Sequence, residues 1–215
     1  MNRVSASLVK SALSLGLVAV IGTTLLTAVN HVTEGRIAQQ ERRVVLEQLG
    51  QIISPESYDN DLEDDWIRFR DEHGFPQGQE VTAYRARRQG QPVAVILRFA
   101  AVDGYSGPIG LLAGIGADGG LIGVRVTTHR ETPGLGDGIE IEKSDWIRSF
   151  EGTSLGNPPS EEWTVRRDGG AFDQFTGATI TPRAVVKAVR RALEYHASHR
   201  AVLYGAEAQG KETDS

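Results

Sequence analysis

The most prominent hydrophobic pattern is a largely apolar stretch near the N-terminus, which carries no charged residue from Ser11 to Val29. As an α-helix rising about 1.5 Å per residue, this stretch would reach roughly 28 Å, close to the thickness of the hydrocarbon core of a bilayer. The pattern therefore predicts a transmembrane helix at 11–29, preceded by a short tail at 1–10. A cleaved signal peptide and a buried soluble helix are the alternatives.

The charges that flank this stretch leave its orientation open. Arg3 and Lys10 precede it, and Arg36, Arg42 and Arg43 follow it, so the count of basic residues is nearly equal on the two sides. The short N-terminal tail favours a cytoplasmic N-terminus.

Residues 30–80 combine a helical pattern with an acidic segment. Charged and aliphatic residues alternate from Glu34 to Leu49, which predicts a helix that ends at Gly50. The segment from Pro55 to Asp65 is acidic and rich in turn formers, and it predicts a solvated loop, with a cation site as the alternative. Its spacing matches no complete calcium-binding loop. We interpret 30–80 as a helical connector and an acidic loop.

The pattern from 81 to 200 predicts a folded domain. Alternating or continuous apolar runs, typical of strands, are separated by short glycine-rich turns, which favour antiparallel pairing. The expected strands are Val81–Arg87, Pro92–Val102, Ile109–Ile115, Leu121–Thr128 and Glu161–Arg167, and the expected helices are Asp145–Phe150 and Thr181–His199. The predicted class is α+β, a mixed or antiparallel sheet with flanking helices, followed by a flexible tail at 201–215.

Composition narrows the possible functions. The net charge of −5 provides no basic field for nucleic acid, so a nucleic-acid partner is not expected. The absence of cysteine excludes disulfides, thiolate nucleophiles and iron–sulfur ligation by this chain. If the protein moves electrons, a cofactor without thiol ligands must carry them. No metal site is expected.

The segment from Asp173 to Pro182 predicts a tight loop that enters a helix. Pro182 suits the first helical position and Thr181 suits the N-cap. Gly177 and Ala178 have little or no side chain, so another molecule can approach the backbone. The helix N-terminus favours a phosphate, and Thr179 adds a hydroxyl there. An ordinary capped helix start is the alternative.

Two further loops carry candidate chemistry. The segment His129–Asp137 contains a proline and two glycines that permit a close backbone approach. Within it, His129 and Glu131 are candidates for acid–base work, with a surface salt bridge or turn contact as the alternative. The turn Asp103–Ile109 is expected either to shape the same pocket or to be purely structural.

These loops resemble the FMN-binding domain family of bacterial redox membrane complexes. The pattern Asp-x-x-Thr-Gly-Ala-Thr, from Asp173 to Thr179, is similar to the flavinylation motif of the family. The resemblance implies that a flavin transferase joins FMN through a phosphoester to Thr179, with Thr181 as a lesser alignment. The implied cofactor-binding residues are Asp173, Thr176, Gly177, Ala178, Thr179 and Thr181 in this loop, and Glu131, Thr132, Gly134 and Leu135 in the other.

Together with the N-terminal span, the chain is similar to the family of G subunits of Rnf electron-transport complexes, also called Rsx, and in plan to the C subunit of the sodium-pumping NADH:quinone oxidoreductase. The resemblance implies an electron-carrying subunit with no catalytic site of its own, in a complex that couples ferredoxin and NAD chemistry to cation movement. It also implies membrane and peripheral Rnf subunits as partners. The expected location is the bacterial inner membrane, single-pass, with the soluble domain in the periplasm.

Two other classes of function remain open from the sequence. One is a non-redox, membrane-anchored binding or assembly protein. The other is an enzyme that uses a flavin on a small substrate, for which His129 is the only histidine in the motif loops.

Overall fold

The computed structural model describes residues 13, 15–16, 19–20, 23, 46–71, 74–205 and 212–213, and the chain divides into two units between Glu47 and Gln48. In the first unit all described residues are helical, and Thr23 donates its hydroxyl to the carbonyl of Ala19 at 2.8 Å. Most of the predicted span 11–29, and most of the predicted helix 34–49, lie outside the described residues. Within the described part of the chain, no helix is both long enough and apolar enough to cross a bilayer.

A six-stranded sheet forms the centre of the second unit, in the order β5-β4-β3-β2-β1-β6. Neighbouring strands are antiparallel except β1 and β6, which pair in parallel. The strands are β1 Trp66–Arg70, β2 Glu80–Arg88, β3 Gln91–Ala101, β4 Ile109–Gly116, β5 Leu121–Thr128 and β6 Glu212–Thr213. The predicted α+β class with a mixed sheet is confirmed, as are the four strands from β2 to β5.

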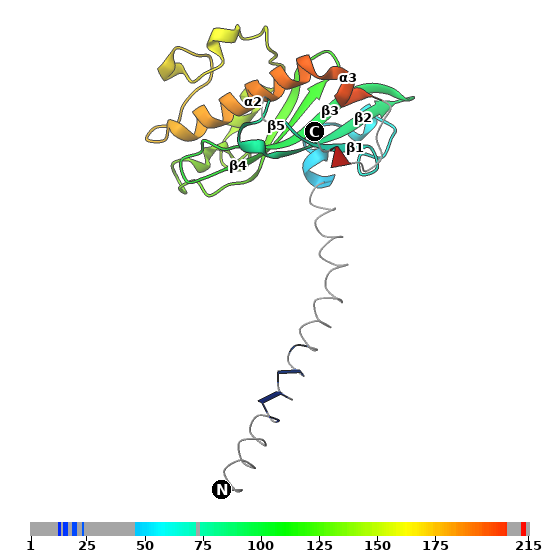
Figure 1. Cartoon of the computed structure of the whole chain (residues 1–215). Coiled ribbons are helices and arrows are strands. Elements are labelled where there is room, and N and C mark those ends of the chain that lie inside the picture. Colours follow the sequence, from blue (N-terminus) through cyan, green and yellow to red (C-terminus); the bar gives the residue numbers. More distant parts are fainter. Residues whose placement is uncertain are drawn as a thin grey trace. The chain divides into compact units, whose positions relative to one another are not determined.

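The long helix α2, Ile180–Ser198, lies across one face of the sheet and leads into the short helix α3, Arg200–Tyr204 (Figure 1). Strand alternation points Val95, Leu97 and Phe99 of β3 toward this face, where they join the buried valines Val185 and Val189 of α2 in one core. Full burial of such a side chain contributes about 1.5–3 kcal/mol, so this layer is the main apolar contribution to stability.

The remaining helical elements are short 3-10 turns in the connections. They are η1 Pro55–Ser57, η2 Pro76–Gly78, η3 Asp137–Ile139, η4 Asp145–Phe150, η5 Ser160–Glu162 and η6 Arg166–Asp168. The predicted helix 145–150 is therefore present as a 3-10 helix, and its first turn is capped by the Ser144 hydroxyl, which accepts from Trp146 N at 3.2 Å.

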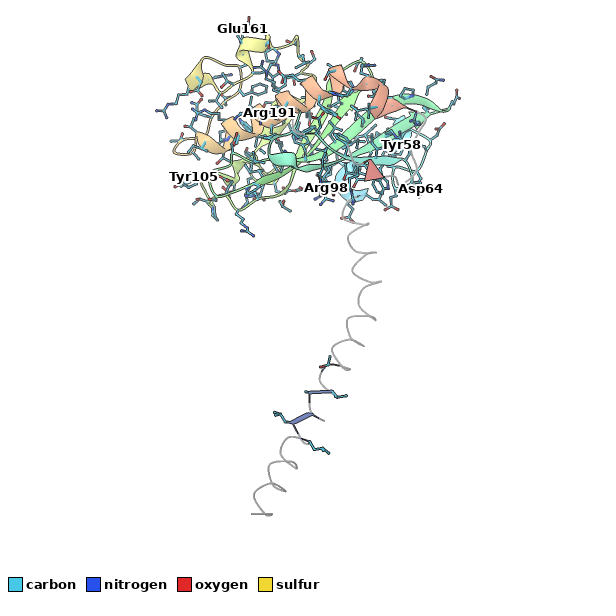
Figure 2. All side chains as sticks on the ribbon, viewed as in Figure 1. Tyr58, Asp64, Arg98, Tyr105, Glu161 and Arg191 are labelled. Carbon is cyan, nitrogen blue, oxygen red and sulfur yellow. The ribbon has the colours of Figure 1, made fainter. Side chains whose placement is uncertain are left out.

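The second face of the sheet is covered by the segment that follows residue 48. Leu49, Ile52 and Ile53 are buried, and a Cβ placed on Gly114 of β4 would clash with the Cγ2 atom of Ile52. Farther along this face Arg98 is exposed, and Figure 2 shows it away from α2. The glycine in β4 therefore provides the space that this covering segment occupies.

Strand β1 falls inside the region 30–80 that the sequence assigned to a connector. Its residues Ile67 and Phe69 are buried in the core, while Arg68 between them is half-buried and Arg70 is exposed. The second unit begins at Gln48, so the acidic segment and β1 belong to the same compact unit as the sheet.

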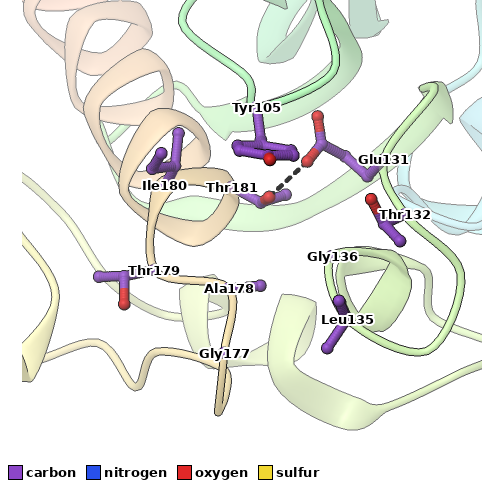
Figure 3. A pocket seen from close by; sticks show the side chains of 10 residues that line it. All are labelled: Tyr105, Glu131, Thr132, Leu135, Gly136, Gly177, Ala178, Thr179, Ile180 and Thr181. Atoms are coloured by element: carbon purple, nitrogen blue, oxygen red, sulfur yellow. Dashed lines mark hydrogen bonds between the residues drawn. The ribbon is translucent and has the colours of Figure 1, made fainter.

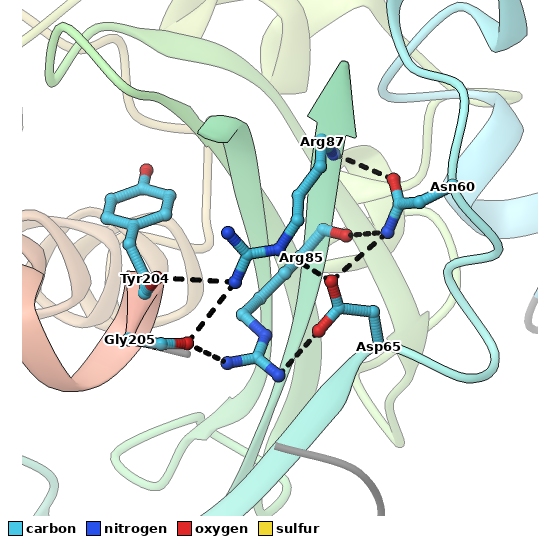
Figure 4. Close-up of polar contacts among 6 residues, drawn as sticks. All are labelled: Asn60, Asp65, Arg85, Arg87, Tyr204 and Gly205. Atoms are coloured by element: carbon cyan, nitrogen blue, oxygen red, sulfur yellow. Dashed lines mark hydrogen bonds and ion pairs between the residues drawn. The ribbon is translucent and has the colours of Figure 1, made fainter. Parts of the chain in front are cut away.

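The acidic segment also differs from a solvated loop. The carboxylate of Asp65 contacts Arg85 Nη2 at 2.5 Å and Arg87 Nε at 2.7 Å, and Asn60 donates to the Arg85 carbonyl at 2.8 Å (Figure 4). Arg85 is 1% exposed and also donates to the Gly205 carbonyl at 2.9 Å. This network ties the start of β1 to β2 and to the end of α3. In the described residues no group of three or more His, Asp or Glu side chains is arranged to hold a metal ion.

Two other expectations from the sequence differ from the structure. Residues 161–167 form turns η5 and η6 rather than a strand. The alternating apolar residues Trp163 and Val165 are buried, as expected for a strand. The backbone groups of this segment, however, form hydrogen bonds with nearby turns instead of a neighbouring strand, for example Ala171 N to Glu162 O at 2.9 Å. The predicted flexible tail 201–215 contains most of α3, with Leu203 fully buried, and strand β6.

We expect Gly114→Ala to lower the free energy of unfolding by about 1–3 kcal/mol, because the new methyl group displaces Ile52 from a packed face. Urea denaturation measures this change. Gly156→Ala is the matched control, since nothing lies within 4 Å of a Cβ at that position. Equal stability of the two variants would contradict the packing described here.

We also expect stability to fall as the pH drops from about 6.5 to about 4, because of His196. Burial lowers the pKa of His196 to about 4, and its Nε2 atom lies 2.9 Å from the Tyr204 hydroxyl. The unfolded chain takes up this proton near pH 6.5, so the folded state, which binds it only near pH 4, loses stability across that window. Between pH 7 and pH 5 the expected loss is about 2 kcal/mol. In His196→Gln the fall measured by urea denaturation should shrink by that amount, and an unchanged fall would contradict this assignment.

Candidate functional site

A cavity of about 380 Å³ opens between the β3–β4 loop, the loop after β5 and the start of α2 (Figure 3). Its volume lies within the range of about 300–1,000 Å³ that is typical of small-molecule sites. The lining residues are Tyr105, Glu131, Thr132, Leu135, Gly136, Gly177, Ala178, Thr179, Ile180 and Thr181.

The three loops meet at the carboxylate of Glu131, which is 4% exposed. Thr181 donates its hydroxyl to Glu131 Oε2 at 2.5 Å, and the backbone N–H of Ser106 donates to Oε1 at 3.0 Å. A Cβ on Gly136 would lie 3.0 Å from Glu131 Cβ and from Thr181 Oγ1, so a glycine permits this close packing. Because both carboxylate oxygens have donors, the buried charge is compensated.

Helix α2 begins at Ile180, two residues before the predicted start at Pro182. Thr179 takes the capping position, and its side chain makes no capping hydrogen bond; the first backbone bond runs from Arg183 N to Thr179 O at 3.3 Å. The predicted N-cap, Thr181, is wrong because its hydroxyl is committed to Glu131. The helix extends backward past Pro182 because the N–H groups of a first turn have no intrahelical partner to lose.

An aromatic contact holds the loop that precedes α2. Trp146 Nε1 donates to the Asp173 carbonyl at 2.7 Å, and the rings of Trp146 and Phe175 lie edge to face with centroids 5.3 Å apart. Gly177 adopts φ +82°, a left-handed conformation that favours glycine. The loop thus reaches α2 in a defined conformation beside Leu135, whose Cδ2 atom would lie 3.4 Å from a Cβ on Gly177.

The loop after β5 is fixed by its own backbone. Gly136 N donates to Thr132 O at 3.0 Å, and Gly134, at φ +76°, donates to Asp137 Oδ1 at 2.8 Å. This turn presents Leu135 with 47% of its surface exposed.

His129 does not line the cavity. Its Nε2 atom lies 2.8 Å from Glu140 Oε1, and its Nδ1 atom accepts from Glu131 N at 3.1 Å. His129 therefore makes a polar contact with Glu140 and a contact within its own turn, in agreement with the turn-contact alternative.

The cavity brings together seven of the ten residues expected to bind the cofactor, namely Glu131, Thr132, Leu135, Gly177, Ala178, Thr179 and Thr181. Gly134 and Thr176 line a broader neighbouring groove, which shares Leu135 with the cavity. Asp173 lines neither, since its exposed carboxylate pairs with Arg166 at 3.1 Å. Gly136 was expected only as one of the two glycines that allow a close backbone approach, and the sequence did not single out Ile180, which adjoins the motif residues.

The cavity fits a ligand with a flat apolar ring and an anionic end. Tyr105, Leu135 and Ile180 border it with 67%, 47% and 45% of their surfaces exposed, and such grouped apolar side chains are typical of a ligand site. The Thr179 hydroxyl and the N-terminus of α2 lie together, where the helix favours a phosphate. A flavin nucleotide has both parts, so the residues present fit FMN.

Replacing Thr181 by valine should lower the free energy of unfolding by about 1–3 kcal/mol, because it leaves the buried Glu131 carboxylate without its side-chain donor. Thr181→Ser keeps the hydroxyl and should retain most of the stability. Chemical denaturation of both variants provides the comparison. If serine and valine have the same effect, the hydrogen bond to Glu131 contributes nothing measurable.

Comparison with known proteins agrees with a site for FMN. The family model described as the FMN-binding domain matches residues 104–194, which include all three loops, and the one described as the RnfG N-terminal region matches residues 1–52. The chain is 47% identical over 201 residues to the G subunit of an ion-translocating oxidoreductase complex of Pseudomonas aeruginosa, covering 94% of each chain. It is 43% identical to the corresponding G subunit of Shewanella baltica, covering 92% of this chain and 93% of the relative, and 42% identical to that of Vibrio cholerae, covering 91% and 93%. The chain therefore belongs to the family of Rnf complex G subunits, whose members are flavoproteins with an FMN-binding domain.

Proposed function

We propose that this chain carries FMN covalently on Thr179 through a phosphoester and passes electrons within a membrane-bound Rnf-type complex. The observation that carries the proposal is the state of the Thr179 hydroxyl. It lies at the cavity and at the start of α2, and it makes no capping bond.

The geometry supports Thr179 over Thr181 as the attachment point. Thr181 is 1% exposed and donates its hydroxyl to Glu131, so a phosphate there would have to break a buried hydrogen bond. Thr179 is only half-buried, and the contact of its hydroxyl is with Arg167 Nη1 at 3.5 Å. The accessible hydroxyl is the better acceptor for a group delivered by another protein.

Attachment requires an activated phosphate on the flavin. In a flavin dinucleotide the FMN phosphorus is bonded to a second phosphate that can leave. The Thr179 oxygen forms the new bond to phosphorus, the bond to the second phosphate breaks, a nucleoside monophosphate departs, and the hydroxyl proton passes to solvent. No oxidation state changes. A flavin transferase is the expected partner for this step.

FMN, when bound, supplies the redox chemistry, and the protein positions it. Glu131 and the backbone of the two loops shape the inner part of the cavity. Tyr105, Leu135 and Ile180 keep large exposed surfaces at its border, so a ring held there stays close to the protein surface. This arrangement suits exchange of electrons with another protein.

The proposal that this chain works within a membrane complex is supported by the relatives, whose names describe a subunit of an ion-translocating oxidoreductase complex. For this chain we infer the other membrane and peripheral Rnf subunits as partners, and coupling of ferredoxin and NAD chemistry to cation movement. We infer a single span at 11–29 in the bacterial inner membrane, with the FMN-binding domain in the periplasm.

Thr179→Ala should abolish covalent FMN while the domain still folds, because the half-buried hydroxyl makes no capping bond. The chain is produced together with an active flavin transferase, denatured, and analysed by intact mass and peptide mapping. The unmodified sequence should gain the mass of FMN minus water on the peptide that contains Thr179, and Thr181→Val should gain it as well.

Covalent FMN retained in Thr179→Ala would refute the site. No added mass on the unmodified chain, with the transferase active on a control protein, would favour a non-redox binding or assembly protein instead.

A further inference from the structure

Three arginines surround the start of α2, and two of them are already paired. Arg166 contacts Asp173 at 3.1 Å. Arg183 binds both oxygens of Asp168 at 2.6 and 3.0 Å, and this hydrogen-bonded contact lowers the pKa of Asp168. Arg167, which lies between these pairs in the sequence, forms no ion pair within the described part of the chain. Its positive charge helps to lower the pKa of the neighbouring Asp168 after the hydrogen bond and charge of Arg183, but its guanidinium makes no direct contact with a carboxylate there.

The guanidinium of Arg167 lies next to Thr179. Arg167 Nη1 is 3.5 Å from Thr179 Oγ1, which is too long for a strong hydrogen bond to a neutral hydroxyl. The backbone N–H of Arg167 donates to Gln174 Oε1 at 3.1 Å, so η6 and the loop of Thr179 are held together. The backbone of Arg167 is thus held beside the loop that carries the hydroxyl.

We propose that Arg167 binds the phosphate that joins FMN to Thr179. The inference rests on the proposed function, since it assumes a phosphate on this hydroxyl. The two free oxygens of such a phosphate stand farther out than Oγ1 and share one negative charge. A guanidinium presents two parallel N–H donors that match this pair of oxygens, and bonds of this kind are shorter and stronger than neutral ones.

The paired neighbours make Arg167 the arginine available for this role. Arg166 and Arg183 would each have to give up a carboxylate before turning to a phosphate. Asp168 adjoins Arg167 in the sequence, yet Arg183 occupies both of its oxygens. The site is also exposed, so salt should weaken the attraction.

The test measures the initial rate of FMN attachment to the full chain, using purified flavin transferase and a flavin dinucleotide, followed by intact mass. Arg167→Ala should be about tenfold slower than the unmodified chain, and Arg167→Glu should be slower than alanine. Arg167→Lys should lie between alanine and the unmodified chain, because it keeps the charge and loses the two parallel donors. Arg70→Ala is the matched control: it removes the same charge from β1, where the side chain is 68% exposed, and should leave the rate unchanged.

A second measurement separates phosphate binding from recognition by the transferase. After prolonged loading, the ³¹P resonance of the attached phosphate should differ between Arg167→Ala and the unmodified chain, and should be unchanged in Arg70→Ala. Equal rates for Arg167→Ala and Arg70→Ala would overturn the proposal. A slower rate with an unchanged ³¹P resonance would also overturn it, because Arg167 would then act only on the transferase. If the unmodified chain gains no FMN, the proposed function itself fails, and the two failures are distinguishable.

Discussion

The arrangement of the site depends on one buried carboxylate. Glu131 lies in the loop after β5, and its oxygens accept from Thr181 at the start of α2 and from Ser106 in the β3–β4 loop. A buried charge is tolerated only when such donors are present. Separation of the three loops would therefore leave the Glu131 carboxylate either exposed to solvent or buried without donors. The contact also orients the helix start. Residues two apart on a helix point in different directions, so turning Thr181 inward leaves Thr179 to face outward.

Much of the sheet was predictable because its strands carry the pattern that buries one or both faces. The runs in β3 and β4 are continuous because α2 covers one face and Leu49, Ile52 and Ile53 cover part of the other. Strand β1 was missed because it is short, Arg68 and Arg70 alternate with Ile67 and Phe69, and it follows an acidic segment. The partners of Asp65, Arg85 and Arg87, are at least twenty residues away in the sequence, so only the fold shows that this acid is paired.

The residues of the site were predictable from the sequence, but the contacts between its loops were not. The motif residues from Thr176 to Thr179 and from Glu131 to Leu135 were identified from the sequence, and most of them line one cavity. The bond between Thr181 and Glu131 spans fifty residues, and no local rule indicates it. Helix-start preferences assigned Thr181 to capping, yet a buried carboxylate competed successfully for its hydroxyl. Arg167 was not foreseen for a similar reason, because its distance to Thr179 is set by how η6 packs against the motif loop.

The openness of the cavity gives a physical reason for the covalent link that we propose. Tyr105, Leu135 and Ile180 remain largely exposed, so a ring lying against them would bury less of its surface than in a closed pocket. Contacts of that kind alone would hold a nucleotide weakly. The proposed bond from Thr179 would remove the cost of bringing the ligand from solution and would keep its local concentration high, as a tether does for any second binding event. The ring would then stay near the surface, where electrons could pass to a partner, while Arg167 would bind its phosphate in the way we propose.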